Sequence, residues 1–276
     1  MLEESYDSMK AYLKYMVNHC EDGIVTSEEP GGWCLGDWCP LGNRVTIPEA
    51  FVNTYFLAKC ADMTAETAEI LGHTEDIAVY KELAAASRNA IIKHYYNEET
   101  ASFCEGTQGA DAFALDIGLG NEKTKKGFIE KYEKLLTFDT GIFGTDLVIR
   151  MLFNFGRGDI AYKMLINEEV TSFYNMKSHG ATTLWENWDG CDSRCHPMFG
   201  AIVEYFFSGI LGINRADDKA GYKEITINPA KIPELKNVRG TMKTAYGDVT
   251  VEITTDENGN RNIRTETTGE ITVKKG

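Results

Sequence analysis

The sequence predicts a mainly helical chain that ends in a small all-β domain. Apolar residues recur at helical spacing as far as residue 214, whereas from residue 220 onward they recur at every second position. Over 276 residues, 43% hydrophobic and 11% aromatic side chains suffice for a packed core and exclude global disorder. We therefore expect a helical domain over residues 1–214 and an antiparallel β-domain over residues 215–276.

The helical part divides into consecutive apolar stripes. The stripe that starts at Ile47 continues through Ala58, and Gly72 is a typical residue to end that helix. Thr74 is the expected N-cap of the next helix. We expect no strand between residues 46 and 165. Further stripes occupy residues 3–18, 109–119, 122–136, 143–155, 158–166 and 197–211.

Two connections between these helices are long, namely residues 20–45 and 167–196. They contain all four tryptophans of the chain. Long ordered loops on a rigid scaffold commonly carry function. These two connections are therefore the first candidates for a functional site.

The β-domain is predicted from period-two patterning and turn residues. Asn258-Gly259 is a strong hairpin signal, and Gly247-Asp248 is a weaker turn. Five short strands are expected, around residues 225–227, 238–246, 249–253, 263 and 271–273.

Composition narrows the classes of partner. With 28 basic and 42 acidic side chains the net charge is −14, which argues against nucleic acid and anionic membrane surfaces. The first residues are acidic where a signal peptide is basic, and no apolar run approaches about 18 residues. The seven cysteines include no Cys-x-x-Cys pair. We therefore expect no metal and no cofactor, and reduced thiols in a soluble cytoplasmic protein.

The segment Gly180–Gly190 carries the strongest chemical signal. It reads Trp-Glu-Asn-Trp-Asp at positions 185–189, and Asp192 and His196 follow closely. Aromatic rings exclude water from a neighbouring carboxyl, and they stack on the apolar faces of sugar rings. The alternative is that Trp185 and Trp188 merely anchor the loop while Glu186 points into water.

The other long connection repeats the pairing of an acid with an indole. Asp37 and Trp38 follow glycines at positions 31, 32 and 36, which let a backbone approach a ligand closely. The alternative is a packed loop in which Asp37 caps the helix near Pro48 or binds local amides. Together the two loops predict one acidic, aromatic-lined pocket with His196 near its wall.

These motifs resemble those of the bacterial α-L-rhamnosidases, family 78 of the glycoside hydrolases. The similarity includes Gly-Asp-Trp at 36–38, Thr140–Thr145, Thr-Thr-Leu-Trp-Glu-Asn-Trp-Asp at 182–189, and His196 before Gly200–Glu204. Gly221–Pro229 resembles the start of their C-terminal β-sandwich. The resemblance implies an (α/α)6 toroid of six helical hairpins, the six-hairpin glycosidase type, followed by an antiparallel β-sandwich.

The resemblance also implies a reaction. It is the inverting hydrolysis of terminal α-L-rhamnosides, in which one carboxylic acid protonates the leaving oxygen and a carboxylate activates water. By the same resemblance Glu186 is the general base, and a rhamnose-containing glycoside is the substrate. The implied sugar-binding residues are Asp37, Trp38, Trp185, Trp188 and His196.

The chain departs from the family pattern in one respect. The family's general acid lies in an Asp-Cys-Pro-x-Arg-x-Glu run well upstream of the Gly-Asp-Trp loop, and the 36 residues before Asp37 contain no such run. About eight helices are expected where the toroid has twelve. We therefore expect an incomplete toroid with little activity of its own, whose open apolar face pairs with a second copy or with the missing N-terminal segment.

Two other functions stay open at this point. A non-catalytic carbohydrate-binding or assembly subunit would keep the aromatic pocket and lack the acid. A sugar epimerase on a similar helical toroid would need a pair of histidines, and only His196 lies in the candidate loops.

Overall fold

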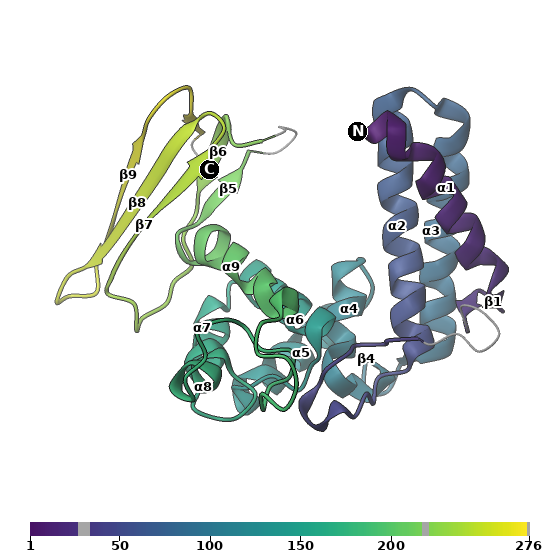
Figure 1. The fold of residues 1–276 in the computed structure, drawn as a ribbon, viewed down its shortest axis with the longest axis horizontal. Helices are drawn as coiled ribbons and strands as arrows, with labels where there is room; N and C mark the ends of the chain where they lie inside the picture. The colour runs from purple at the N-terminus through teal and green to yellow at the C-terminus, as the bar shows by residue number, and fades with distance from the viewer. Residues whose placement is uncertain (27–33, 217–220, 275–276) are drawn as a thin grey trace. The chain divides into compact units, whose positions relative to one another are not determined.

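The structure is a computed structural model that describes residues 1–26, 34–216 and 221–274 (Figure 1). The chain forms two compact units. The first unit comprises Met1–Lys134, Asp139–Val148 and Asn187–Asp189, and the second comprises Leu135–Phe138, Ile149–Glu186 and Gly190–Gly276. The Trp-Glu-Asn-Trp-Asp run therefore has its first two residues in the second unit and its last three in the first.

The first unit is built from helices. They are α1 (Leu2–Asn18), α2 (Glu49–Leu71), α3 (Thr74–Tyr95), α4 (Ala110–Asp116), α5 (Glu122–Leu135) and the first turns of α6 (Ile142–Asn154). The predicted stop at Gly72 is confirmed, because Gly72 caps α2 with a φ of 81°. The helix expected near Pro48 is also confirmed, because α2 begins at Glu49 with Pro48 as its N-cap. The predicted cap of the next helix shifts by one residue, since His73, not Thr74, is the N-cap of α3.

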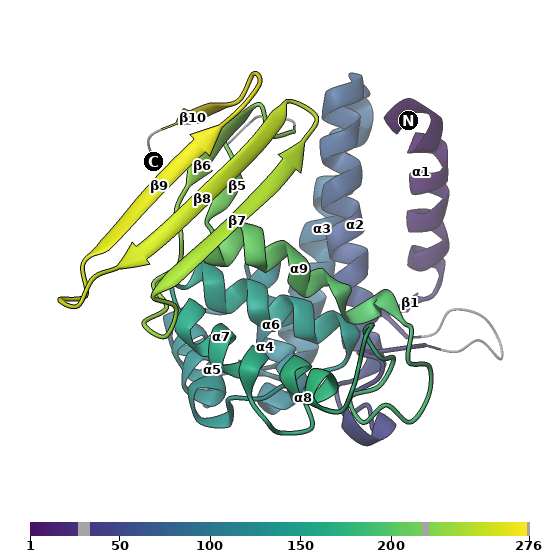
Figure 2. The ribbon, with the colours of Figure 1, turned by 60° about the vertical axis from the view of Figure 1, so that its left-hand side comes forward.

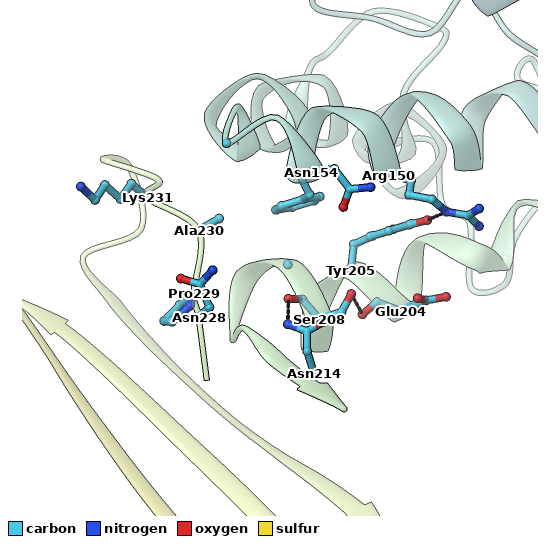
Figure 3. A pocket seen from close by; sticks show the side chains of 13 residues that line it. Arg150, Asn154, Glu204, Tyr205, Ser208, Asn214, Asn228, Pro229, Ala230 and Lys231 are labelled. Carbon is cyan, nitrogen blue, oxygen red and sulfur yellow. Dashed lines mark hydrogen bonds between the residues drawn. The ribbon is translucent and has the colours of Figure 1, made fainter. Parts of the chain in front are cut away.

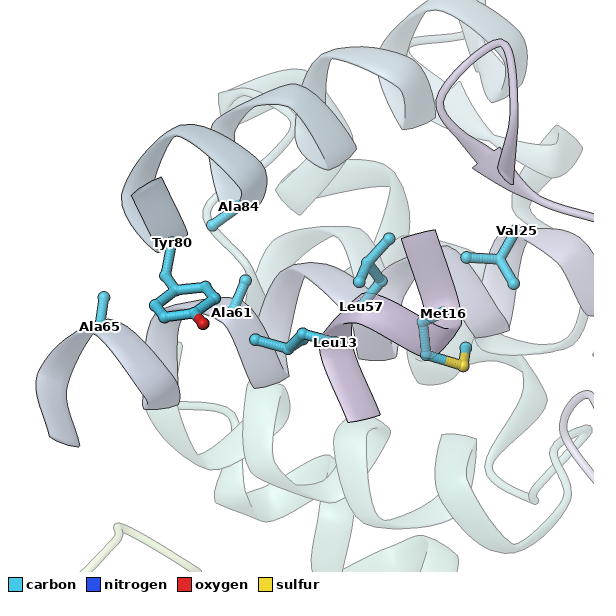
Figure 4. Packing of buried hydrophobic residues seen from close by; sticks show 8 residues of the cluster. All are labelled: Leu13, Met16, Val25, Leu57, Ala61, Ala65, Tyr80 and Ala84. Atoms are coloured by element: carbon cyan, nitrogen blue, oxygen red, sulfur yellow. The ribbon is translucent and has the colours of Figure 1, made fainter. Parts of the chain in front are cut away.

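Three long helices share one core in this unit. α2 and α3 lie antiparallel because only two residues connect them, and α1 packs along α2 (Figures 1 and 4). Leu13 of α1 and Leu57 of α2 are both 1% exposed, and fully burying such a side chain contributes about 1.5–3 kcal/mol. The cluster is completed by Met16, Val25, Ala61, Ala65, Tyr80 and Ala84.

Short hairpins and 3₁₀ turns connect the helices. β1 (Cys20–Glu21) pairs with β2 (Ile24–Val25), and β3 (Tyr96–Asn97) pairs with β4 (Ser102–Phe103). The prediction of no strand between residues 46 and 165 is therefore wrong in one detail, because two residues on each side of the turn after α3 pair as a hairpin. The 3₁₀ segments are η1 (Leu41–Asn43) and η2 (Cys104–Gly109).

The second unit contains shorter helices. These are α7 (Gly158–Ile166), α8 (Phe173–Ser178), the 3₁₀ segment η3 (Pro197–Ala201), α9 (Ile202–Tyr205) and the π-helical turn η4 (Phe206–Ile210), which follow the last turns of α6. The six residues of α8 were not predicted. Its N-cap is Ser172, whose hydroxyl accepts from the amide of Asn175. The single helix predicted over 197–211 is instead a chain of three helical types.

Two three-stranded sheets form the C-terminal part of the second unit (Figure 2). One contains β5 (Ile213–Arg215), β6 (Glu224–Ile227) and β10 (Thr272–Lys274), and the other contains β7 (Asn237–Thr244), β8 (Gly247–Thr255) and β9 (Arg261–Thr267). Their core is formed by Leu211, Ile213, Ile225, Val249, Val251 and Ile253. The predicted β-domain and its two turns are confirmed, with two differences. β5 was not predicted, and β10 pairs with β6 in parallel.

No helix within the described ranges is both long enough and apolar enough to cross a membrane. The cytoplasmic location stays a prediction.

Candidate functional site

The carboxylate of Asp37 caps the start of α6, which lies about a hundred residues further along the chain. Its Oδ2 accepts from the amide of Gly141 at 2.7 Å, and its Oδ1 accepts from Phe143 at 3.0 Å and Gly144 at 2.9 Å. The carbonyl of Trp38 accepts from the amide of Ile142 at 2.8 Å. The four amides that a helix leaves without an internal partner are thus all bound by two consecutive residues.

This close approach explains two glycines of the Thr140–Thr145 motif. A Cβ atom on Gly141 would lie 2.0 Å from the carbonyl oxygen of Trp38, and one on Gly144 would lie 2.6 Å from Oδ2 of Asp37. Neither space can hold a side chain while the loop keeps its position. The Gly-Asp-Trp motif at 36–38 and the Thr140–Thr145 motif, which lie far apart in the sequence, are therefore packed directly against each other.

Asp37 is fully buried and belongs to a polar network. Burial raises the pKa of Asp37 to about 7, although its three amide donors and Gln108 act in the opposite direction. Gln108 donates to the carbonyl oxygen of Asp37, while its own Oε1 accepts from the amides of Thr46 and Ile47. Gln108 has a φ of 45°, in the left-handed region that ordinary residues avoid, so the fold holds it there at a cost.

Trp188 also binds this region of the first unit. Its indole nitrogen donates to the carbonyl oxygen of Thr140 at 3.0 Å, and its side chain is fully buried. Trp38 is half-buried. The structure therefore brings Asp37, Trp38 and Trp188 together around residues 140–144. Residues 31–33, the first part of the glycine-rich cluster, lie outside the described residues.

In the second unit, Glu186 lies on a loop that is closed at its neck. The amide of Glu186 donates to the carbonyl oxygen of Ser193 at 2.8 Å, and the amide of His196 donates to that of Leu184 at 2.8 Å. These two bonds hold residues 184–186 beside residues 193–196. The position of Glu186 is therefore set by the backbone of its own loop.

Trp185 fixes the inside of the same loop. It is 5% exposed, and the guanidinium of Arg194 lies 5.1 Å from the centre of its ring. Gly190 packs directly against the indole, since a Cβ atom there would lie 2.6 Å from Cε3 of Trp185. Arg194 also donates to the carbonyl oxygen of Gly190. These contacts show that Trp185 packs inside the loop, as the anchoring alternative expects.

Glu186 and His196 lie next to each other in this loop. Nδ1 of His196 is buried and lies 3.4 Å from Oε2 of Glu186, without the geometry of a hydrogen bond. The Glu186 side chain is 27% exposed, so water reaches it. Within the described ranges, its carboxylate meets only Nδ1 of His196 and the amide of Ser193, both through Oε2. Oε1 is therefore left to accept from water.

The predicted residues thus form two groups, one in each unit. Asp37, Trp38 and Trp188 form the first, and Trp185, Glu186 and His196 form the second. That both groups line one pocket stays a prediction. Sequence reasoning missed Gln108 and Arg194, which carry no motif. Among the residues described, no three His, Cys, Asp or Glu side chains are placed to hold a metal ion.

Comparisons with known proteins agree with the resemblance seen in the sequence. The family model of the bacterial alpha-L-rhamnosidase 6 hairpin glycosidase domain matches residues 1–210. The model of the bacterial alpha-L-rhamnosidase C-terminal domain matches residues 212–265.

Individual relatives are much longer than this chain. An alpha-L-rhamnosidase of Formosa agariphila is 31% identical over 266 residues, which are 90% of this chain and 28% of the relative. One of an Alteromonas species is 27% identical over 280 residues, which are 94% of this chain and 30% of the relative. The chain therefore spans less than a third of the length of these curated relatives.

Solved structures show the same fold. The alpha-L-rhamnosidase of Streptomyces avermitilis, complexed with L-rhamnose, superposes with a TM-score of 0.85 at 24% identity, covering 99% of this chain and 27% of that one. The enzyme of Aspergillus terreus superposes with a TM-score of 0.88 at 20% identity, covering 99% of this chain and 34% of that one. The predicted fold class, a six-hairpin glycosidase domain followed by a small β-domain, is confirmed.

Proposed function

The chain belongs to the bacterial alpha-L-rhamnosidase family, and from this premise we propose that it supplies the general base of an inverting α-L-rhamnosidase. The observation that carries the proposal is Glu186. It is a water-accessible carboxylate on a backbone-fixed loop, beside a histidine and next to a buried indole.

Glu186 has the features that a general base needs. The base of an inverting glycosidase takes a proton from the water that attacks the anomeric carbon, on the face opposite the leaving group. Oε1 of Glu186 is open to water, while Oε2 lies against the imidazole of His196 and the amide of Ser193. The carboxylate is thus held through one oxygen and can act through the other.

His196 has a proposed role through Glu186. Its backbone is fixed by Leu184, so the ring restrains the rotamer of the neighbouring carboxylate. A protonated ring would also stabilise the carboxylate by charge. We retain His196 and Trp185 as sugar-binding residues in the proposal, because both lie beside the proposed base.

Asp37 has a structural role in this proposal. Its carboxylate is fully buried against the first amides of α6, which favours a role in holding the Trp38 loop. In this proposal Trp38 is the residue of that loop that meets the sugar. Trp188, bound to Thr140, holds the end of the Trp-Glu-Asn-Trp-Asp run in place.

The general acid is proposed to come from outside these 276 residues. The sequence contains no Asp-Cys-Pro-x-Arg-x-Glu run, and it matches only 28% of the length of the Formosa agariphila relative. In an inverting pair the two carboxyl groups lie about 6.5–9.5 Å apart. Without an acid the leaving alkoxide departs unprotonated, which forfeits about 10²–10⁴-fold in rate.

The absence of that run also favours a second candidate, a non-catalytic carbohydrate-binding subunit. Such a protein would bind L-rhamnose and hydrolyse no rhamnoside, even when supplied with the upstream part of a relative. The two candidates therefore differ in one measurable property.

The test is hydrolysis of 4-nitrophenyl α-L-rhamnopyranoside by the chain alone and by the chain joined to the upstream part of the Formosa agariphila relative. We expect turnover by the joined protein, β-L-rhamnose as the first product by NMR, and a Glu186→Gln loss of about 10²–10⁴-fold. Glu169→Gln is the matched control, because Glu169 is an exposed carboxylate on the same connection. Wild-type turnover by Glu186→Gln would overturn the assignment of the base.

A further inference from the structure

The second unit also contains a cavity of about 620 Å³ whose lining includes none of the proposed site residues. Its walls come from the end of α6, from α9 and η4, and from residues 228–231 (Figure 3). In Figure 3, Arg150 and Asn154 extend from α6, Tyr205 and Ser208 belong to α9 and η4, and Asn228–Lys231 form the remaining side. A volume of this size accommodates a ligand of one or two sugar rings.

The cavity is built on the π-helical turn η4. The amide of Leu211 bonds the carbonyl oxygen of Phe206, five residues earlier. Such turns are rare and are frequently found at functional sites. The carbonyl oxygens of Ser208 and Gly209 accept instead from the side chain of Asn214 and from the amide of Ala230, both at 3.0 Å.

These two hydrogen bonds connect Asn214 and Ala230, which lie in the β-domain side of the cavity wall, to the helical turn η4. The segment 228–230 is held from its other side as well, because the amide of Asn228 donates to Gly212 and the guanidinium of Arg261 donates to the carbonyl oxygen of Ala230. A Cβ atom on Gly212 would lie 2.1 Å from the nitrogen of Pro229, so this close contact requires glycine. The walls are therefore connected without any ligand, and the cavity is preformed.

Several polar groups of the lining are not used by the protein. In the part of the chain that the structure describes, the side chains of Asn154, Glu204, Asn228 and Lys231 make no hydrogen bond or ion pair. Each of them lies in an exposed position at the cavity. They can therefore bind a ligand without breaking an existing contact.

The chemistry of the lining fits a polyhydroxylated ligand. An amide side chain both donates and accepts, as a sugar hydroxyl does, and three asparagines line the cavity together with the hydroxyl of Ser208. The half-buried ring of Phe153, which stacks on the buried ring of Tyr205 with centroids 5.8 Å apart, supplies apolar surface for the C–H faces of a sugar. A lining of one carboxylate, two cations and several amides does not select phosphate or a metal ion.

We propose that this cavity is a second carbohydrate-binding site, one that binds a saccharide of one or two rings and takes no part in hydrolysis. The juxtaposition that carries the proposal is Asn154 of α6 opposite Asn228 and Lys231, above the π-helical turn that bears Ser208. The site does not involve Glu186, so it stands whether or not Glu186 is a general base.

The test is an NMR titration of the ¹⁵N-labelled chain with three probes in turn, L-rhamnose, D-galactose and D-glucuronate. At least one probe is expected to shift the side-chain amide signals of Asn154 and Asn228. Asn154→Trp fills the cavity from an exposed position and is expected to weaken this binding at least tenfold. Asn18→Trp is the matched control, because Asn18 is exposed and ends α1 as Asn154 ends α6.

Two further variants separate this site from the proposed active site. Glu204→Ala, which removes the only carboxylate of the lining, is expected to weaken binding severalfold, whereas Glu186→Gln leaves the shifts at Asn154 and Asn228 unchanged. The proposal is overturned if none of the three probes shifts these amides, or if Asn154→Trp binds as tightly as Asn18→Trp. If the joined protein fails to hydrolyse the rhamnoside but the probes still shift the amides of Asn154 and Asn228, only the proposed function is contradicted.

Discussion

Oδ2 of Asp37 occupies the space that a side chain on residue 144 would need, since a Cβ atom on Gly144 would lie 2.6 Å from it. The same carboxylate accepts the Gly144 amide at 2.9 Å. Gly144 thus stabilises the buried carboxylate of Asp37 in two ways. Its amide donates a hydrogen bond, and its lack of a side chain leaves room for the carboxylate. The contact joins the Gly-Asp-Trp motif to the Thr140–Thr145 motif, two of the segments on which the resemblance to rhamnosidases rests.

Gly144→Ala is expected to destabilise the first unit by about 1–3 kcal/mol, because the added methyl group overpacks the contact with Asp37. Urea unfolding measures this change. The matched control is Gly127→Ala, also inside a helix, where a Cβ atom meets nothing within 4 Å. That variant is expected to gain about 0.5–1 kcal/mol from helix propensity. Equal effects at the two positions would contradict the packing argument.

Asp37→Asn is expected to destabilise the protein by several kcal/mol. An amide nitrogen cannot accept from the backbone amides, and each buried donor left unsatisfied costs about 1–3 kcal/mol. Asp37→Ala, which leaves all three amides without an acceptor, should be worse. The free energies of unfolding of the two variants, measured in urea, provide the comparison.

Asp37 also predicts a pH dependence. Its pKa is raised by burial to about 7 from an ordinary value of 3.8, so the folded state binds its proton more tightly than the unfolded chain. The stability from this group is present below pH 3.8 and is lost as the pH rises through about 7. The difference in unfolding free energy between the wild type and Asp37→Asn should therefore shrink from pH 4 to pH 7. If it grows instead, the three amides outweigh burial and the pKa is lowered.

Gly190→Ala is expected to displace the indole of Trp185 and to open the Glu186 loop. Its Cβ atom would lie 2.6 Å from Cε3 of Trp185, and its φ of 68° is strained for alanine. Gly180→Ala separates the two effects, because its φ is 87° but a Cβ atom there meets nothing within 4 Å. We expect about 1–2 kcal/mol from backbone strain alone in Gly180→Ala and a larger loss in Gly190→Ala. Thermal unfolding measures the loss of stability in both variants.

His196→Ala is expected to act through Glu186. In the protein joined to the upstream part of a relative, it should lower kcat by about tenfold or more, since the carboxylate loses the ring that restrains it. On the Glu186→Gln background, the same substitution should lower kcat no further. Independent, multiplying effects in this double-mutant cycle would show that His196 does not act through Glu186.

Local patterns predicted most of the elements because each depends on nearby residues. The helices followed the spacing of apolar residues, Gly72 ended α2 with a left-handed φ, and Asn258-Gly259 formed the turn between β8 and β9. The shortest elements carried too little signal. α8 has six residues and β5 has three, which is less than two periods of the helical or the strand pattern.

The sequence by itself determined the fold class, the family and the identity of Glu186, His196 and the tryptophans as the residues to examine. Only the tertiary structure decided what Asp37 binds. The sequence suggested the helix near Pro48 or local amides, whereas its partners are the amides of α6, more than a hundred residues away. The same holds for the cavity, which joins Asn154 to Lys231. Periodicity and capping act over a few residues, but the partner of a buried polar group depends on the path of the whole chain.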